Sequence, residues 1–484
     1  MYSLTHQSLF VLIGKCLSLF FQLLTPIILV RIFNQNDYGI YRQLIMFALL
    51  LIPISRFSMD KSLYYFLKVD NKNKDQYISQ AYFIPLIISI FFGILIYLFS
   101  WELLSFPYIA NYYNLSFSFI LLLFFMINSK LLDHIFIIEG KARHSLYYFS
   151  FDNAIRLFVM LIFVFTFKTI NFIIIGLAFF YFSKSIFLTC YLFKNYKLSL
   201  FSFNSNILYS QFQYIAPLYL SVIVGKFGAY LDKILLVVLL ASSDFAIYSI
   251  GNFNLVFITI IYTSIGDVIL PRLSQFSKNN NLLKAHRLWV KMIKANAMIT
   301  IPTVLFLIYT APEFISLLFT SEYRDSALVF QISILTLFLQ MLGYGYLLRA
   351  FARTKSVLKA NLIRTIIAVP VGYFLIKQFG VYGASMLFLF SFSLNTIIQL
   401  YETKKLLKIN FKAFIPWNYF LKLFLISSFC LCLLFIIDIN KVNLFNYMLT
   451  SSIIYFPILF IILVKYKFLK IEDIKETVYK VFKK

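Results

Sequence analysis

Residues 79–100 read SQAYFIPLIISIFFGILIYLFS, a stretch without a charged side chain. An α-helix needs about 20 mostly apolar residues to cross the hydrocarbon core of a bilayer. Similar runs recur along the whole chain and are separated by short connections. We therefore expect about fourteen transmembrane helices, near residues 9–33, 43–67, 79–100, 117–139, 146–168, 171–193, 212–240, 246–270, 296–319, 327–349, 357–378, 381–402, 419–437 and 446–464.

The composition favours the same fold class. Of the 484 residues, 61% are hydrophobic and 13% are charged. Soluble domains are roughly 45–50% apolar and about 25% charged, so a soluble fold could not cover this much apolar surface. The sequence predicts an all-α integral membrane protein with one membrane-embedded body and no separate soluble domain.

The net charge of +25 is arranged in a regular pattern. Basic residues lie beside apolar runs rather than in a basic domain, which argues against a nucleic-acid partner. They concentrate in alternate connections, as in the cytoplasmic loops of membrane proteins. We therefore expect a multi-pass membrane protein with both termini in the cytoplasm. The other side carries only a few basic residues, Arg42, Lys168, Arg324, Lys377 and Lys441.

One cytoplasmic stretch, 282–294, has helical periodicity. Its apolar residues gather on one side and include Ala285, Trp289 and Met292, while its lysines lie largely on others. Such a helix can lie in the lipid interface, held by anionic headgroups. The alternative is a solvated basic loop.

Residues that carry chemistry are scattered. The cysteines Cys16, Cys190, Cys430 and Cys432 make no disulfide framework, and the four histidines have no metal-ligand spacing. We expect neither an enzyme nor a metal or cofactor. A membrane-embedded polysaccharide polymerase or ligase is the alternative of another class, but it needs a sizeable external loop. The longest ones, about 101–116 and 320–326, are short.

The chain contains an internal repeat. DYGIY at 37–41 and DFAIY at 244–248 are offset by 207 residues, and NAIR at 153–156 and NLIR at 361–364 by 208. Gly176 and Gly383 are again 207 apart. Parallel repeats of this kind occur in transporters that rock two halves around a midplane site. The repeat predicts two six-helix lobes, 1–195 and 207–407, with appended helices at 417–467 and a basic cytoplasmic tail at 468–484.

These motifs resemble the polysaccharide transporter (O-antigen flippase) family. The resemblance rests on the DYGIY-type turns, LDK at 231–233 and PRL at 271–273, and covers about residues 1–410. The family belongs to the multidrug/oligosaccharidyl-lipid/polysaccharide exporter superfamily. The resemblance implies a V-shaped, MATE-like pair of lobes and a polyprenyl-pyrophosphate-linked glycan as partner. The repeated turn residues are Asp37, Tyr38, Gly39, Tyr41, Asp244 and Tyr248.

Cations outnumber anions inside the predicted spans. A charged residue at mid-membrane costs about 2.5–3.5 kcal/mol on insertion scales, so each needs a reason. A pyrophosphate favours Arg and Lys, whereas a drug cation would favour acids. We predict a cationic substrate site from the residues Arg56, Lys226, Lys61, Lys233, Lys130, Arg156 and Arg364. Arg56 and Lys226 are the deepest candidates, and in span seven Tyr219, Lys226, Tyr230 and Lys233 share one helical face.

Other roles remain open for these residues. Arg56 and Asp60 are spaced i,i+4, and Lys130 and Asp133 i,i+3, so each pair can neutralise itself. Arg156 and Arg364 occupy equivalent repeat positions and can be packing residues. If an H+ or Na+ gradient drives transport, the candidate coupling residues are Asp60, Asp133, Asp232 and Asp267.

The resemblance implies export of an undecaprenyl-pyrophosphate-linked oligosaccharide by alternating access across the bacterial cytoplasmic (inner) membrane, and the excess of cations in the spans agrees with an anionic substrate. The glycan is a repeat unit of O-antigen, capsule or another surface polysaccharide. Membrane lipids and the polysaccharide polymerase machinery are further expected partners. Within the superfamily, a lipid II (peptidoglycan precursor) flippase and a multidrug cation antiporter are the alternatives.

Overall fold

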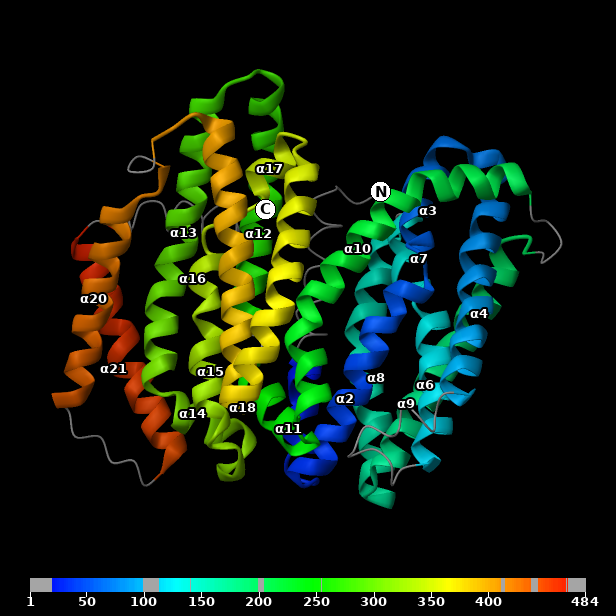
Figure 1. The fold of residues 1–484 in the computed structure, drawn as a ribbon, viewed down its shortest axis with the longest axis horizontal. Helices are drawn as coiled ribbons and strands as arrows, with labels where there is room; N and C mark the ends of the chain where they lie inside the picture. Colours follow the sequence, from blue (N-terminus) through cyan, green and yellow to red (C-terminus); the bar gives the residue numbers. More distant parts are fainter. Residues whose placement is uncertain are drawn as a thin grey trace. The chain divides into compact units, whose positions relative to one another are not determined.

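The structure is a computed structural model that describes residues 20–98, 113–139, 141–198, 204–253, 255–410, 414–436, 443–466 and 468. Throughout these residues every regular element is a helix (Figure 1), which confirms the all-α prediction. Ten of the described helices are long and apolar enough to cross a membrane, so the chain is a multi-pass membrane protein. The count of fourteen spans stays a prediction, since the first expected span lies partly outside the described residues.

The chain divides into two compact units. The first contains residues 1–249 with 365–384, and the second contains 250–364 with 385–484. The helices of the first unit are α2 (Gln35–Ser55), α3 (Met59–Val69), η1 (Asn71–Asn73), α4 (Lys74–Leu98), α6 (Tyr113–Ser129), α7 (Leu132–Ile138), α8 (Ala142–Phe167), α9 (Ile170–Asn195), α10 (Ser205–Leu239) and most of α11 (Ser242–Gly251). The lobe boundaries inferred from the repeat stay a prediction.

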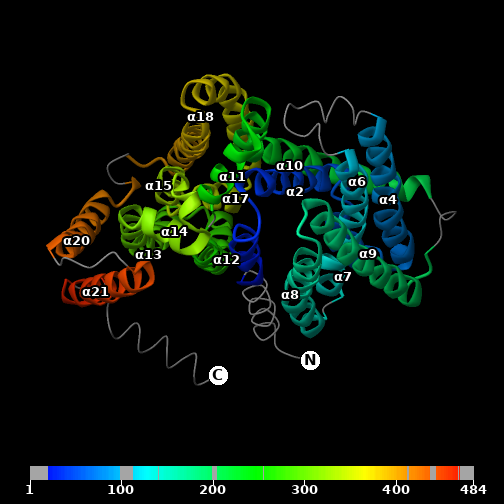
Figure 2. The ribbon, with the colours of Figure 1, turned by 90° about the horizontal axis from the view of Figure 1, so that it is seen from below.

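Within the first unit α4, α6 and α9 lie side by side, and α8 packs on α9 (Figure 2). α10 packs on α2, α3 and α4. α10 carries three charged side chains, Lys226, Asp232 and Lys233. These side chains need protein or water beside them, because lipid cannot satisfy their charges.

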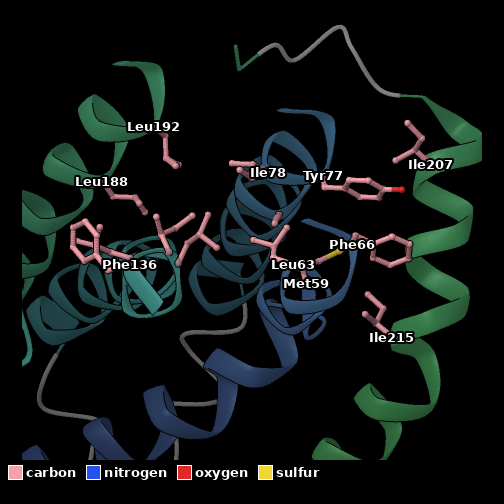
Figure 3. Close-up of a cluster of buried hydrophobic side chains, with 14 residues drawn as sticks. Met59, Leu63, Phe66, Tyr77, Ile78, Phe136, Leu188, Leu192, Ile207 and Ile215 are labelled. Atoms are coloured by element: carbon pink, nitrogen blue, oxygen red, sulfur yellow. The ribbon is translucent and has the colours of Figure 1, made fainter. Parts of the chain in front are cut away.

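A hydrophobic cluster joins five helices at one end of the first unit (Figure 3). Phe66 of α3 stacks on Tyr77 of α4, with ring centroids 4.7 Å apart, and both face Ile207 and Ile215 of α10. The cluster fixes the ends of these helices together, because dense packing of apolar side chains resists displacement. Its members are Met59, Leu63, Phe66, Tyr77, Ile78, Ala81, Leu131, Leu132, Ile135, Phe136, Leu188, Leu192, Ile207 and Ile215.

Two expected spans are broken helices. The run 43–67 forms α2 and α3, which are separated by Phe57 and Ser58 at φ 48° and 55°. This left-handed backbone is unfavourable for residues with a side chain and ends the right-handed helix. The run 117–139 likewise forms α6 and α7. α2 also begins earlier than expected, which places Arg42 inside a helix rather than in a loop.

Two other expected spans, 357–378 and 381–402, lie in one long element, α18 (Thr354–Leu407). Gly380 interrupts it with φ 55° and ψ −130°, values that glycine adopts without the steric cost of a Cβ. Gly383 follows closely, and a Cβ there would lie 2.1 Å from the carbonyl oxygen of Leu375. The expected division between these two spans is therefore present as a glycine break.

The second unit holds the remaining helices. They are α12 (Val256–Lys278), α13 (Leu282–Tyr309), α14 (Ala311–Phe319), η2 (Ser321–Tyr323), α15 (Ser326–Ile334), α16 (Thr336–Gln340), α17 (Tyr346–Ala350), α20 (Trp417–Ile436) and α21 (Leu444–Lys465), with both ends of α18. α12 and α20 pack on α13, and α21 packs on α20 and α14.

The interfacial prediction for 282–294 is wrong. These residues begin the continuous helix α13, and its apolar side is buried inside the protein. Trp289 is 1% exposed and packs on Phe414, with ring centroids 5.0 Å apart. An apolar side with helical periodicity can be buried against protein or against lipid. The pattern of residues 282–294 alone could not distinguish these two environments.

Candidate functional site

Arg56 closes the C-terminal end of α2, where the helix breaks. It is 4% exposed, and its Nη1 donates to the carbonyl oxygen of Ile127 at 2.8 Å, near the end of α6. Its Nε forms an ion pair with Asp60 Oδ1 at 3.8 Å, and neither Nε nor Nη2 has a hydrogen-bond partner. Asp60 also contacts His134 of α7, Oδ2 to Nε2, at 2.8 Å. Arg56 thus ties together the two broken helices.

Lys184 of α9 is the centre of a second buried group. Its Nζ lies 3.0 Å from Asp133 Oδ1 and 2.9 Å from Asp152 Oδ1. Asp133 also pairs with Lys130 at 3.1 Å and accepts a hydrogen bond from Tyr148. These contacts join α7, α8 and α9.

These two groups form what we call the paired network. Its members are Arg56, Lys130, Lys184, Asp60, Asp133, Asp152 and His134. The three basic and three acidic side chains cancel when the imidazole is neutral. Two predicted coupling residues, Asp60 and Asp133, are therefore held by cations here. A charge-neutral set of this kind can hold helices together but attracts a distant anion only weakly.

Lys61 and Lys226 have different surroundings. Both side chains are exposed, and neither pairs with a carboxylate within the described part of the chain. They project from α3 and α10, which pack together, and the charge of Lys61 reaches Lys226. Lys226 Nζ lies 5.4 Å from the centre of the Tyr230 ring. Two neighbouring cations without a carboxylate partner attract an anion.

Lys233 follows Tyr230 by three residues, whereas Lys226 precedes it by four. The Nζ of Lys233 lies 5.8 Å from the centre of the Tyr230 ring. Unlike Lys226 it has a carboxylate, Asp232 Oδ2, at 3.0 Å. Tyr248 donates a hydrogen bond to the same oxygen. Of the four residues predicted to share a face of this helix, Tyr219 instead donates to the carbonyl oxygen of Ile54 and stacks on Phe57.

Arg42 is a residue that the sequence patterns did not single out as a site candidate. It lies two turns into α2, and its Nε is buried without a hydrogen-bond partner. Arg42 lies within electrostatic range of Tyr41 and Tyr230. The charge of Arg156, from α8, also reaches Tyr41, and its Nη1 lies 3.5 Å from Tyr181 Oη. The sequence did show Arg42 as a basic residue next to an expected span. A position in the preceding loop explained that residue equally well.

Two predicted site residues, Arg364 and Asp267, are not placed with the residues above. Arg364 is 7% exposed and belongs to the second unit, so the structure does not bring it to the others within one unit. The side chain of Asp267 lies outside the described part. The roles predicted for both stay predictions.

The repeated turns are helix starts. Asn34 caps α2 by accepting from the Asp37 amide at 2.8 Å, and Asp37 sits at the third helical position. Asp244 has the same position in α11 and accepts from the Ala241 amide at 3.3 Å. An acidic residue there satisfies free amides and suits the helix dipole. The two turns also touch, because a Cβ on Gly39 would lie 1.8 Å from the Ser242 carbonyl oxygen.

A comparison with family models identifies the family. Residues 28–328, more than half of the chain, match the model described as polysaccharide biosynthesis protein. The chain belongs to the polysaccharide biosynthesis protein family. Residues 240–457 also match the model of the lipid II flippase MurJ. The family resemblance predicted from the turn motifs is confirmed.

A curated relative comes from Haloferax volcanii, a probable low-salt glycan biosynthesis flippase, Agl15. It is 23% identical over 206 residues, which are 42% of this chain and 43% of the relative. The match thus spans less than half the length of that relative.

Solved structures show the same fold. The lipid II flippase MurJ in an inward closed conformation matches with TM-score 0.74 and 15% identity, over 96% of this chain and 99% of that one. An inward-facing multidrug resistance MATE transporter of the MOP superfamily matches with TM-score 0.63 and 15% identity, over 83% and 94%. The Vibrio cholerae MATE transporter VcmN in its bent form gives TM-score 0.54 and 13% identity, over 84% and 96%. The predicted MATE-like fold is confirmed.

Proposed function

We propose that this family member is a flippase that moves a polyprenyl-pyrophosphate-linked oligosaccharide across the cytoplasmic membrane. The lipid tail stays in the bilayer while the diphosphate and sugars pass along the protein by alternating access. The undecaprenyl carrier and a surface-polysaccharide repeat unit are the specific cargo we expect. Coupling to an H+ or Na+ gradient stays part of this proposal.

One observation carries the proposal: Lys61 and Lys226 project from the packed helices α3 and α10, and neither pairs with a carboxylate in the described part of the chain. Each lies within electrostatic range of the other. Each lysine in a membrane helix costs about 2.5–3.5 kcal/mol on insertion scales, and their mutual repulsion adds to this cost. A bound diphosphate offsets both terms, because it accepts charge-assisted hydrogen bonds from ammonium groups. Lys61 and Lys226 therefore form what we call the inner station for the diphosphate.

The same two lysines argue against a cationic drug as cargo. A drug cation would be repelled by Lys61 and Lys226, and the nearby carboxylate of Asp232 is already held by Lys233. A lipid II flippase is the second candidate, favoured by the match of residues 240–457 to that model. Lipid II shares the polyprenyl pyrophosphate, so the inner station suits it equally, and only the sugars separate the two cargoes.

The test is a flipping assay with the full chain in liposomes. The probe is a fluorescent undecaprenyl-pyrophosphate disaccharide, and its appearance in the opposite leaflet is measured over time. We expect Lys226→Gln to slow flipping at least about tenfold, since a lost charge-assisted hydrogen bond costs about 1.5–3 kcal/mol. A wild-type rate in Lys226→Gln would refute the inner station.

Lys377→Gln is the matched control. Lys377 lies 5.7 Å from the ring of Tyr373, four residues away, as Lys226 lies close to Tyr230. Its side chain is also exposed, and the substitution removes the same charge from the protein. We expect wild-type flipping in this variant. Unlabelled lipid II added as competitor then decides the cargo: strong competition favours lipid II, and weak competition favours a different glycan.

A further inference from the structure

We infer that Arg42 and Arg156 form a second diphosphate station, separate from Lys61 and Lys226, which receives the cargo at the start of α2. This inference rests on the proposed function and adds where the headgroup goes after the inner station. The charge pattern predicts the α2 start to be extracytoplasmic, so we call this pair the outer station.

The donors of the outer station are incompletely used. The buried Nε of Arg42 has no hydrogen-bond partner, which leaves a charged donor unsatisfied at a cost of about 1–3 kcal/mol or more. Arg156 has only the Tyr181 hydroxyl at 3.5 Å among the contacts described for its guanidinium. The carboxylate one turn earlier on α8, Asp152, lies within electrostatic range of Arg156, but its ion pair is with Lys184 at 2.9 Å.

The arginines differ from the lysines in what they offer an anion. A guanidinium presents a planar fork that grips two oxygens of a phosphate, whereas an ammonium acts as a point charge. Tyr41 lies within reach of both Arg42 and Arg156, and its side chain is 7% exposed. The tyrosine gives the pair a rigid, partly apolar wall that strengthens charge interactions by excluding water.

The two stations are connected by a series of neighbouring side chains. Lys226 contacts the ring of Tyr230 at 5.4 Å. The charge of Arg42 reaches that same tyrosine, and Tyr41 links Arg42 to Arg156. All of these residues belong to the first unit. A diphosphate leaving Lys226 therefore meets Arg42 along the packed helices α10 and α2.

The test counts binding sites on the full chain in lipid nanodiscs. The probe is geranyl pyrophosphate, a short prenyl diphosphate, measured by equilibrium dialysis. We expect two probes per chain in the wild type, and one in each of the double variants Arg42→Gln/Arg156→Gln and Lys61→Gln/Lys226→Gln. Arg42→Lys/Arg156→Lys should keep two sites with weaker binding at one of them. Arg353→Gln, an exposed arginine elsewhere, should keep both.

The outcomes separate the two claims. If the wild type binds one probe that only the lysine variant loses, the outer station is refuted and the inner one stands. If the arginine variant loses binding and the lysine variant does not, the outer station stands and the inner one fails. Equal thermal stability of the variants in the nanodisc excludes unfolding as the cause, and no binding by the wild type refutes both stations.

Discussion

Arg56 and Lys226 carry the same charge on packed helices of one unit, but their surroundings are opposite. Arg56 is buried beside Asp60 and donates to the carbonyl oxygen of Ile127 in α6. Lys226 is exposed and lies within electrostatic range of another lysine, Lys61. The sign of a buried charge therefore does not assign its role. What decides is whether the protein itself supplies the counter-charge.

The comparison extends to whole groups. Each cation of the paired network has a carboxylate within 4 Å, so the group contributes mainly by holding α2, α7, α8 and α9 in place. Arg42, Arg156, Lys61 and Lys226 have none at that distance in the described residues. We expect substitutions in the first group to affect stability, and substitutions in the second to affect binding.

The largest stability effect should come from Lys184→Met. Removing this lysine leaves Asp133 and Asp152 buried without their main partner, which typically costs about 3–5 kcal/mol. The measurement is the amount of folded protein in the membrane and its thermal midpoint in detergent. Adding Asp133→Asn should restore part of the loss, because the neutral amide removes one uncompensated charge. Unchanged stability of Lys184→Met would show that the network is not structural.

Gly39→Ala should have an intermediate effect. The new methyl group would meet the backbone of Ser242, and such overpacking costs about 1–3 kcal/mol. The same shift would displace α2, which carries Arg42, so binding at the outer station should weaken as well. Gly225→Ala is the matched control, since nothing lies within 4 Å of its added Cβ. Equal thermal midpoints of both variants would contradict the close contact of the two turns.

The smallest effect should come from Glu139, a paired carboxylate that follows the last residue of α7 and lies just beyond the apolar helix Leu115–Ile138. Burial alone would raise the pKa of Glu139, but hydrogen bonds from Lys141, Tyr191 and Tyr196 outweigh it and hold this pKa below its ordinary value of 4.5. The carboxylate therefore adds stability above its unfolded pKa, and this is lost as the pH falls through the folded pKa. Because Lys141 is 42% exposed, we expect a small contribution.

Thermal unfolding of Glu139→Gln against pH checks this contribution. The variant should melt below the wild type near neutral pH, and the difference should narrow as the pH falls from neutral to below 4.5, the ordinary pKa of a glutamate. A difference in thermal midpoint that stays constant across this pH range would mean that the charge of Glu139 does not contribute to stability.

The sequence predicted the fold class and the family, because apolar run lengths and the repeated turns are direct consequences of membrane thickness and helix capping. The sequence also offered two interpretations of Arg56: a substrate-binding residue, or an ion-pair partner of Asp60. It could not predict that Asp152 binds Lys184, since these residues are 32 positions apart and meet only through packing of α8 on α9. Nor could it place Arg42 inside α2, because the helix begins in a polar stretch capped by Asn34.

The most direct test of these roles compares two neutralising changes in one binding experiment. The affinity of geranyl pyrophosphate is measured for the full chain in nanodiscs, for Lys226→Gln and for Arg56→Gln/Asp60→Asn. The second variant removes both charges of a pair but keeps amide groups that can hydrogen-bond to Ile127 and His134. We predict that Lys226→Gln weakens binding at the inner station at least about tenfold, while the double variant stays within about threefold of the wild type at both stations. Loss of binding in the double variant with wild-type binding in Lys226→Gln would contradict this and assign the diphosphate to Arg56.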